Sequence, residues 1–205
     1  MRVAALALAT AMLAGCSTVN PAAPHVRTFR LEYPPPAAPD GPATSATMRV
    51  VPFGIAALYD RQGFVYRAGP HEIGVDNYNR WLGDPAGMIT DLLARDLAAS
   101  RRYQAILQAP SALPSDYELN GQVEAIEERA GDGCTAALRL RIFLVRVPPR
   151  GPRVVVFEDV FEAEEPCGTG DPATFAAAMS RALERVSEAV QAAVLAAVEQ
   201  QPPAA

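Results

Sequence analysis

The feature of this sequence that most constrains its fold is a long apolar stripe near the C-terminal end. Asp171 and Pro172 open it, and this pair suits the cap and the first turn of a helix. Large apolar residues then recur at helical spacing, namely Phe175, Met179, Leu183, Val186, Val190 and Val194. A stripe of this length predicts an amphipathic helix whose apolar face needs a sheet beneath it.

Three stretches of alternating apolar and polar residues precede the stripe, at 117–126, 137–147 and 154–163. Such alternation predicts half-buried strands, and the turn-forming residues at 148–152 connect the last two as a hairpin. The expected inward faces hold Tyr117, Leu119, Val123 and Ala125 in the first strand, Leu138, Leu140, Ile142 and Leu144 in the second, and Val155, Phe157 and Phe161 in the third.

The N-terminal half predicts shorter elements. Strands are expected at 25–33, 46–53, 64–68 and 103–107, a brief pairing segment at 71–75, and a helix at 85–100 that follows a lead-in at 76–81. Asp84 and Pro85 suit the start of that helix. The element order predicts an α+β fold with two layers, in which a largely antiparallel sheet is covered on one face by two amphipathic helices.

The predicted hairpin brings Cys134 and Cys167 together. If it folds about Arg150, partner positions sum to about 300, so Cys134 faces the neighbour of Cys167 and the two thiols come within bridging range. In an oxidising compartment this favours a disulfide, with a redox pair or a metal site as the alternatives. The sequence has no Cys-x-x-Cys motif, which a redox pair or a metal site would favour. Only His25 and His71 could supply imidazole ligands to a metal.

The N-terminus has a basic start and a short apolar run that ends in Leu13-Ala14-Gly15-Cys16, which is typical of a secretory signal peptide. The four residues resemble the bacterial lipobox, and the resemblance implies cleavage before Cys16 and acylation of that residue. It also implies export to the outer membrane, because Ser17 stands where an Asp favours retention. The expected organisation is a lipoprotein signal peptide at 1–15, a tether at 16–24, a single domain at 25–199 with a Pro-rich connector at 34–42, and a disordered tail at 200–205.

Candidate chemistry is sparse. The net charge is −5, so neither nucleic acid nor an anionic membrane surface is an obvious electrostatic partner. All 18 basic residues are Arg, which we interpret as coding bias. No Gly-x-Ser-x-Gly elbow, phosphate-binding loop or metal-ligand spacing occurs, so the sequence predicts no catalytic, cofactor-binding or metal-binding residue and a non-enzymatic role. Glu124 and the pair Glu127-Glu128 are expected to face Arg139 and Arg141 on the neighbouring strand.

Several short motifs share an order with a known family. They are Val50-Val51-Pro52, Leu58-Tyr59-Asp60-Arg61, Phe64-Val65-Tyr66-Arg67, Asn79-Arg80-Trp81-Leu82 before a helix, and Tyr117-Glu118-Leu119 at the start of a long strand. Over most of 44–198 this order resembles the ABC-type transport auxiliary lipoprotein family. The resemblance implies a lipid-anchored protein on the periplasmic face of the outer membrane. It also implies that this protein serves an ABC transporter of lipids by docking a mammalian-cell-entry-domain protein.

Two other functions remain open at this point. One is a structural or envelope-assembly lipoprotein with no transporter partner, and the other is a carrier that itself holds lipid cargo between helices and sheet. Tyr59, Phe64, Tyr66 and Trp81 are candidate partner contacts, because exposed aromatic residues often anchor interfaces. Packing of these four side chains in the core is the competing interpretation.

Overall fold

The computed structural model describes residues 25–38, 41–131, 133–168 and 170–201. The predicted signal peptide and tether, and the tail from 202, lie outside these residues. Within the described part, nine strands form one mixed sheet and two helices lie against it. In chain order the elements are β1 (Arg27–Phe29), β2 (Thr47–Val50), β3 (Gly54–Ile55), β4 (Gly63–Arg67), β5 (Ile73–Trp81), α2 (Pro85–Ala99), β6 (Ala105–Gln108), β7 (Tyr117–Ala130), β8 (Cys134–Arg146), β9 (Val154–Gly168) and α3 (Pro172–Gln200).

Strand β7 is the one around which the sheet is built. Along one side it pairs antiparallel with β8, which in turn pairs antiparallel with β9. Along its other side β2, β3 and β4 pair with it in parallel, one after another in chain order. β6 extends the sheet beyond β2, and β5 and then β1 extend it beyond β4. The parallel ladders are short and the long ladders are antiparallel, so the predicted fold class is confirmed.

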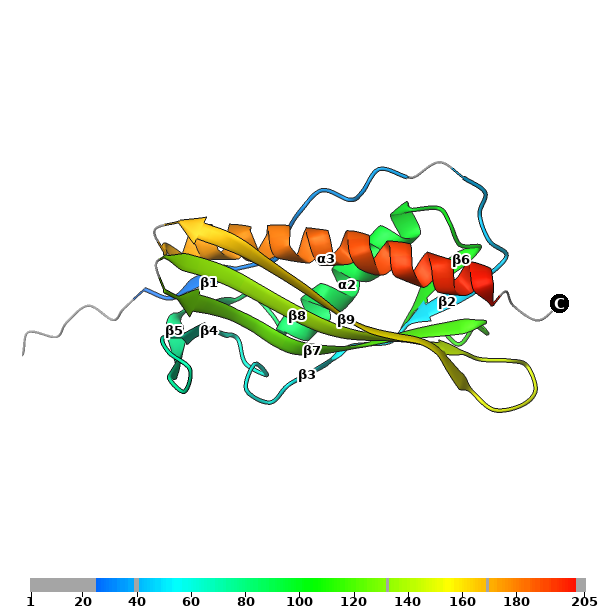
Figure 1. Ribbon diagram of the computed structural model, residues 1–205, viewed down its shortest axis with the longest axis horizontal. Coiled ribbons are helices and arrows are strands. Elements are labelled where there is room, and N and C mark those ends of the chain that lie inside the picture. The colour runs from blue at the N-terminus through cyan, green and yellow to red at the C-terminus, as the bar shows by residue number, and fades with distance from the viewer. Residues whose placement is uncertain (1–24, 39–40, 132, 169, 202–205) are drawn as a thin grey trace, which may run out of the picture.

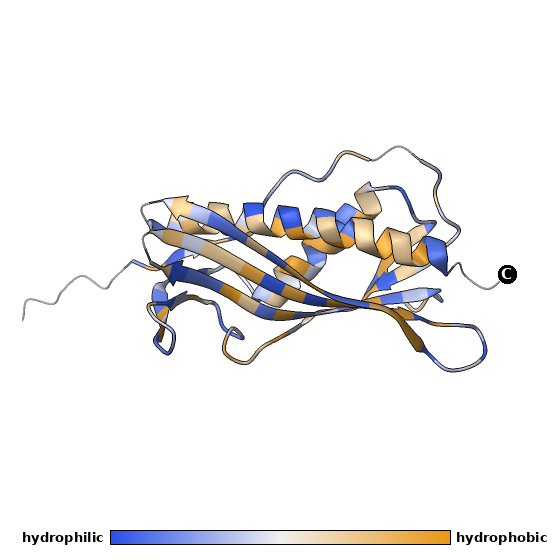
Figure 2. Cartoon of the chain, viewed as in Figure 1, coloured by the Kyte–Doolittle hydropathy of each residue, from blue (hydrophilic) through white to orange (hydrophobic). Residues whose placement is uncertain are grey.

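Both helices cover the same face of the sheet, as the sequence predicts (Figure 1). α3 packs along β8 and β9, and α2 contacts β6 and α3. Hydrophobic and hydrophilic residues alternate along β7, β8 and β9 (Figure 2), and the apolar residues turned to the helices are buried. The predicted stripe of α3 is buried from Phe175 to Val194. This apolar interface is the main core of the protein.

Local sequence signals set the helix ends. The Asp84 carboxylate accepts hydrogen bonds from the backbone N–H groups of Ala86 and Gly87, and Pro85 begins α2. Asp171 accepts from the N–H group of Ala173 at the start of α3 in the same way. Both N-caps therefore lie where the sequence predicts them, because capping needs only residues within one turn.

The structure shortens one predicted strand of the N-terminal half and contradicts the predicted lead-in to the first helix. The strand expected at 25–33 is only β1, after which the chain crosses the helix layer (Figure 1) and buries Leu31 and Tyr33 against it. The lead-in expected at 76–81 is the second half of β5, where Asn79, Arg80 and Trp81 pair in parallel with β1. Sequence periodicity misses this pairing because its two partners lie about 50 positions apart and the contact is decided by tertiary packing.

β-Bulges change two predicted faces. A register shift between Val123 and Ala125 moves Ala125 to the outer face, opposite Arg139. Because side chains alternate along a strand, everything after the bulge also changes sides. Glu127 therefore points outward and Glu128 points toward the helices, opposite Ala136. A similar irregularity between Leu144 and Val145 places Val155 on the face opposite to Phe157.

Candidate functional site

The four aromatic residues considered as partner contacts differ in exposure. Phe64 and Trp81 are buried with ring centroids 4.5 Å apart, and Phe175 of α3 packs against both. Their burial assigns them to the core, where they hold the start of α3 to β4 and β5. Tyr59 is also buried, whereas Tyr66 is 41% exposed. A partner contact therefore stays a prediction for Tyr66.

Tyr59 belongs to a polar network on the outer face of the sheet. Its hydroxyl donates to Glu127 at 2.6 Å, and the Arg67 guanidinium donates to both carboxylate oxygens at 2.9 and 3.0 Å. Arg129 adds a contact at 3.0 Å. Burial acts to raise the pKa of Glu127, but the hydrogen bonds from Arg67, Tyr59 and Arg129 outweigh it and hold that pKa below its ordinary value.

The predicted cross-strand pairing holds for one glutamate of the three. Glu124 accepts from Arg139 and from Arg141, both at 2.7 Å. These hydrogen bonds lower the pKa of Glu124. Glu127 pairs instead with Arg67 and Arg129, and Glu128 lies on the other face because of the bulge.

Glu128 faces a cleft of about 390 Å³ on the helix side of the sheet. β4 contributes Phe64 and Tyr66, β5 contributes the stretch from Val75 to Tyr78, and the loop before α3 contributes Gly170 and Pro172. Tyr78 is 54% exposed, so two tyrosine rings stand at this cleft with much of their surface free. The Tyr66 ring is held over Gly74, since a Cβ atom at that position would collide with it. The cleft thus has an aromatic wall.

The charge of this cleft is negative. Asp76 accepts from the backbone N–H groups of Tyr78 and Asn79 and from the Asn79 amide at 2.7 Å. Glu128 makes no hydrogen bond or ion pair with any described residue, and no Arg or His is among the described residues that line the cleft. Burial and the nearby charge of Asp76 raise the pKa of Glu128. Two carboxylates beside two tyrosine rings form a site that suits a cationic group.

A second buried carboxylate, Asp96, was not singled out by the sequence. It accepts hydrogen bonds at 2.6 Å from the hydroxyls of Tyr33 and Ser187 and at 2.8 Å from Arg95. The network ties the segment after β1 to both helices. His25 and His71 are both exposed, and neither is bonded to the Ser187–Asp96 pair. The available signal was a charged residue inside the apolar stripe of α2, four positions after Leu92.

A more apolar groove of about 490 Å³ lies at the other end of the helix layer. The C-terminal half of α3 contributes Ala192 and Leu195, the end of α2 contributes Ser100, and Tyr103 follows it. Tyr103 is buried, and its hydroxyl has no hydrogen-bond partner among the described residues. This groove is the concave feature that a lipid-carrier function would require.

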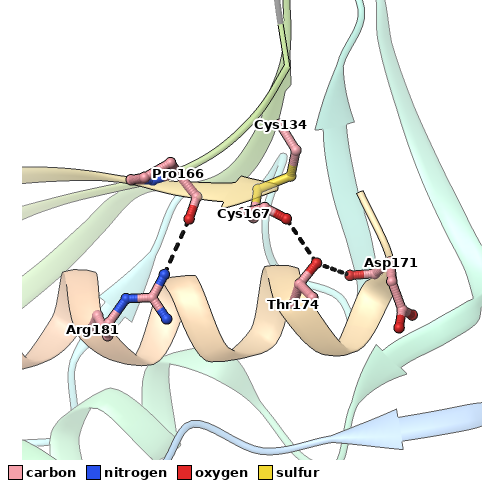
Figure 3. Close-up of a disulfide and its surroundings, with 6 residues drawn as sticks. All are labelled: Cys134, Pro166, Cys167, Asp171, Thr174 and Arg181. Carbon is pink, nitrogen blue, oxygen red and sulfur yellow. Dashed lines mark hydrogen bonds between the residues drawn. A yellow bond between two sulfur atoms is a disulfide. The ribbon is translucent and has the colours of Figure 1, made fainter. Parts of the chain in front are cut away.

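The disulfide expected from the hairpin register is present. Cys134 at the start of β8 and Cys167 near the end of β9 are bonded, with Cα atoms 5.0 Å apart. Figure 3 shows the Thr174 hydroxyl donating to the carbonyls of Cys167 and Asp171, each at 2.7 Å, and Arg181 donating to the carbonyl of Pro166. The disulfide therefore ties the start of β8 to the end of β9, and these hydrogen bonds hold the end of β9 against the first turns of α3, beside the cleft.

The last predicted features concern the lipid anchor, membrane-spanning helices and metal sites. Cys16, the predicted lipidation residue, lies outside the described residues. None of the described helices is long and apolar enough to cross a membrane. Among the same residues, no group of His, Cys, Asp and Glu side chains is arranged to hold a metal ion.

The fold is shared with solved structures of low sequence identity. Protein XCC0632 from Xanthomonas campestris, of the family DUF330, is 23% identical over 85% of this chain and 98% of its own, with a TM-score of 0.77. An uncharacterized protein is 15% identical over 83% and 99%, with a TM-score of 0.65. The hypothetical protein CT253 from Chlamydia trachomatis is 9% identical over 75% and 99%, with a TM-score of 0.52. At these identities the likeness shows a common fold alone.

The family model is more informative than these structures. The model of the ABC-type transport auxiliary lipoprotein component matches residues 29–191, which include every strand from β2 to β9, α2 and most of α3. The chain therefore belongs to this family of lipoproteins that assist ABC-type transporters. No curated protein matches the chain.

Proposed function

We propose that this protein is a non-enzymatic accessory lipoprotein, anchored at Cys16 to the periplasmic face of the outer membrane. In this role it docks a mammalian-cell-entry-domain protein of an ABC-type lipid transport system. The observation that carries the proposal is the family match over residues 29–191, joined to the lipobox-like Leu13-Ala14-Gly15-Cys16. The family supplies the role in transport, and the motif supplies the anchor.

The positions of β1 and of the turn between β8 and β9 support a docking role. The chain enters the fold at β1, and the turn between β8 and β9 lies at the opposite end of the molecule (Figure 1). Val154 and Val155, at the start of β9, are exposed there. An anchor at one end leaves this apolar surface pointing away from the membrane and free for a protein partner.

Crosslinking in cells tests the proposal. The full-length protein is crosslinked and purified, and the captured proteins are identified by mass spectrometry. A mammalian-cell-entry-domain protein or its transporter is expected among the main products. Capture of envelope-assembly proteins without any transport component would support the structural function in its place.

Two variants test the predicted anchor and the membrane in which the protein lies. Cys16→Ala removes the predicted acylation site, and Ser17→Asp is expected to keep the lipoprotein at the inner membrane. After density-gradient separation of the membranes, we expect wild type in the outer-membrane fraction and Ser17→Asp in the inner-membrane fraction. Equal distribution of wild type and Ser17→Asp would remove the outer-membrane assignment while leaving the family role intact.

A further inference from the structure

We propose that the cleft lined by Tyr66, Tyr78, Asp76 and Glu128 binds the primary ammonium group of an ethanolamine phospholipid in the membrane that carries the anchor. The inference rests on the membrane anchoring in the proposed function and adds a ligand group to it. Its ligand is a lipid headgroup at the membrane surface, so the acyl chains stay in the bilayer.

The first step of the argument is the charge balance along β7. Glu118 pairs with Arg153 at 2.9 Å, Glu124 with Arg139 and Arg141, and Glu127 with Arg67 and Arg129. Glu128 is the exception on this strand, for it has no ion pair with any described residue. The positions after His25 that the structure leaves undescribed contain no Lys, Arg or His in the sequence. No cation of the described chain pairs with Glu128, so this carboxylate is available to a cation of another molecule.

The second step is the surplus of hydrogen-bond acceptors. Both oxygens of Glu128 are unbonded among the described residues, and Asp76 already accepts from two backbone N–H groups. A half-buried carboxylate without donors is costly, so a ligand rich in donors is favoured here. A primary ammonium brings three donors and a positive charge, whereas a quaternary one brings the charge alone.

The third step is the shape of the wall. Tyr66 and Tyr78 offer ring surface at the cleft, and cations bind favourably over such rings. The Tyr66 ring occupies the space that a Cβ atom at Gly74 would need, so the glycine allows this ring to stand at the cleft. A cleft of about 390 Å³ holds a headgroup and leaves no room for two acyl chains.

The fourth step is the position of the cleft relative to the anchor, which favours a lipid over a protein side chain. Arg27, the first residue of β1, contacts Asp171 at 3.2 Å, and Asp171 lies between the cleft residues Gly170 and Pro172. Arg27 follows Cys16 by eleven positions. Eleven extended residues span at most about 40 Å, so the cleft stays within one short tether of the membrane surface. Exposed tyrosines are also frequent where proteins meet the headgroup layer.

The test measures headgroup binding by the full-length acylated lipoprotein in detergent. Glycerophosphoethanolamine is titrated in, and ¹³C-labelled tyrosine rings are followed by NMR. We expect saturable shifts of the Tyr66 and Tyr78 signals, and at least ~5-fold weaker binding of glycerophosphocholine and glycerophosphoglycerol.

Matched variants assign the effect to the cleft. Glu128→Gln should weaken binding by about tenfold, because it removes the unpaired charge while keeping the shape. Tyr78→Ala should weaken it about fivefold, whereas Tyr78→Phe keeps the ring and should bind within about twofold of wild type. Glu72→Gln removes an exposed charge at the same end outside the cleft and should also bind within about twofold.

Three outcomes would overturn the inference. The first is the absence of shifts in folded wild type, and the second is equal binding of glycerophosphoglycerol. The third is tighter binding of N-acetyl-lysine amide than of glycerophosphoethanolamine, which would make a protein side chain the occupant. The assay contains no transporter, so its failure leaves the crosslinking result untouched, and a failed crosslinking experiment leaves headgroup binding measurable.

Discussion

Glu127 and Glu128 are neighbours in the sequence and occupy two different environments. Glu127 lies on the outer face of β7, 1% exposed, and receives hydrogen bonds from Tyr59, Arg67 and Arg129. Glu128 lies on the helix face, half-buried in a cleft, and has no partner among the described residues. Their pKa values shift in opposite directions, down for Glu127 and up for Glu128. The comparison shows that pairing outweighs burial for the first carboxylate, whereas burial decides the second.

The bulge between Val123 and Ala125 creates this difference. In an unbulged strand, Glu127 would share the helix face with Val123, and Glu128 would join the outer face with its arginines. One extra residue therefore places Glu127 on the outer face beside its arginines and leaves Glu128 on the helix face for a ligand.

The largest expected effect comes from removing the paired glutamate. Glu127→Ala leaves Arg67 and the Tyr59 hydroxyl without their acceptor, and losing one partner of a buried pair costs about 4 kcal/mol. Urea unfolding should show this loss in the free energy of unfolding. Glu164→Ala is the control, because Glu164 also pairs with Arg129 but is exposed, and it should cost under ~1 kcal/mol. Similar losses for both variants would mean that burial of Glu127 contributes nothing.

The second largest effect is expected from removing the disulfide, which lies beside the cleft. Replacing Cys134 and Cys167 together by Ala should lower the free energy of unfolding by about 3 kcal/mol, because the unfolded chain regains the freedom of the loop between them. The same change loosens the loop that brings Gly170 to the cleft, so headgroup binding should weaken as well. Wild type treated with a reductant should show the same loss of stability. An unchanged unfolding curve in the double variant would argue against a structural bond.

The smallest expected effect on stability at neutral pH is that of Glu128→Gln, within ~0.5 kcal/mol of wild type, because no partner is left behind. Its signature is the pH profile. Burial and Asp76 raise the pKa of Glu128 above its ordinary value of 4.5, so the folded state binds this proton more readily than the unfolded state. Lowering the pH through the raised, folded-state pKa of Glu128 should therefore stabilise wild type relative to Glu128→Gln.

Glu127 should behave in the opposite way. Its pKa is held below 4.5, so its contribution is complete above that value and is lost as the pH falls through the folded-state pKa. Unfolding by urea between pH 3 and 8, compared for wild type, Glu127→Gln and Glu128→Gln, measures both slopes. Parallel profiles for the two variants would contradict the assignment of these carboxylates to different environments.

Local sequence features determined much of this fold. Asp84 and Asp171 cap their helices as predicted, since a cap needs only the residues of the next turn. The spacing of Cys134 and Cys167 about one hairpin turn was enough to pair them, because an antiparallel hairpin fixes its partners by arithmetic. The stripe on α3 and the alternation on β8 likewise fixed which faces meet.

The candidate site, by contrast, depends on packing between distant segments. The parallel pairing of β1 with β5 turned the stretch up to Trp81 into a strand, and packing against Phe175 buried Trp81 and Phe64. The bulge in β7 settled which glutamate faces the cleft. These events depend on contacts between distant segments, whose energy is absent from any short window of sequence. Local sequence patterns therefore set the long strands, the two helices with their caps and the disulfide. Long-range packing decided the pairing of β1 with β5, which charges were paired and which one was left for a ligand.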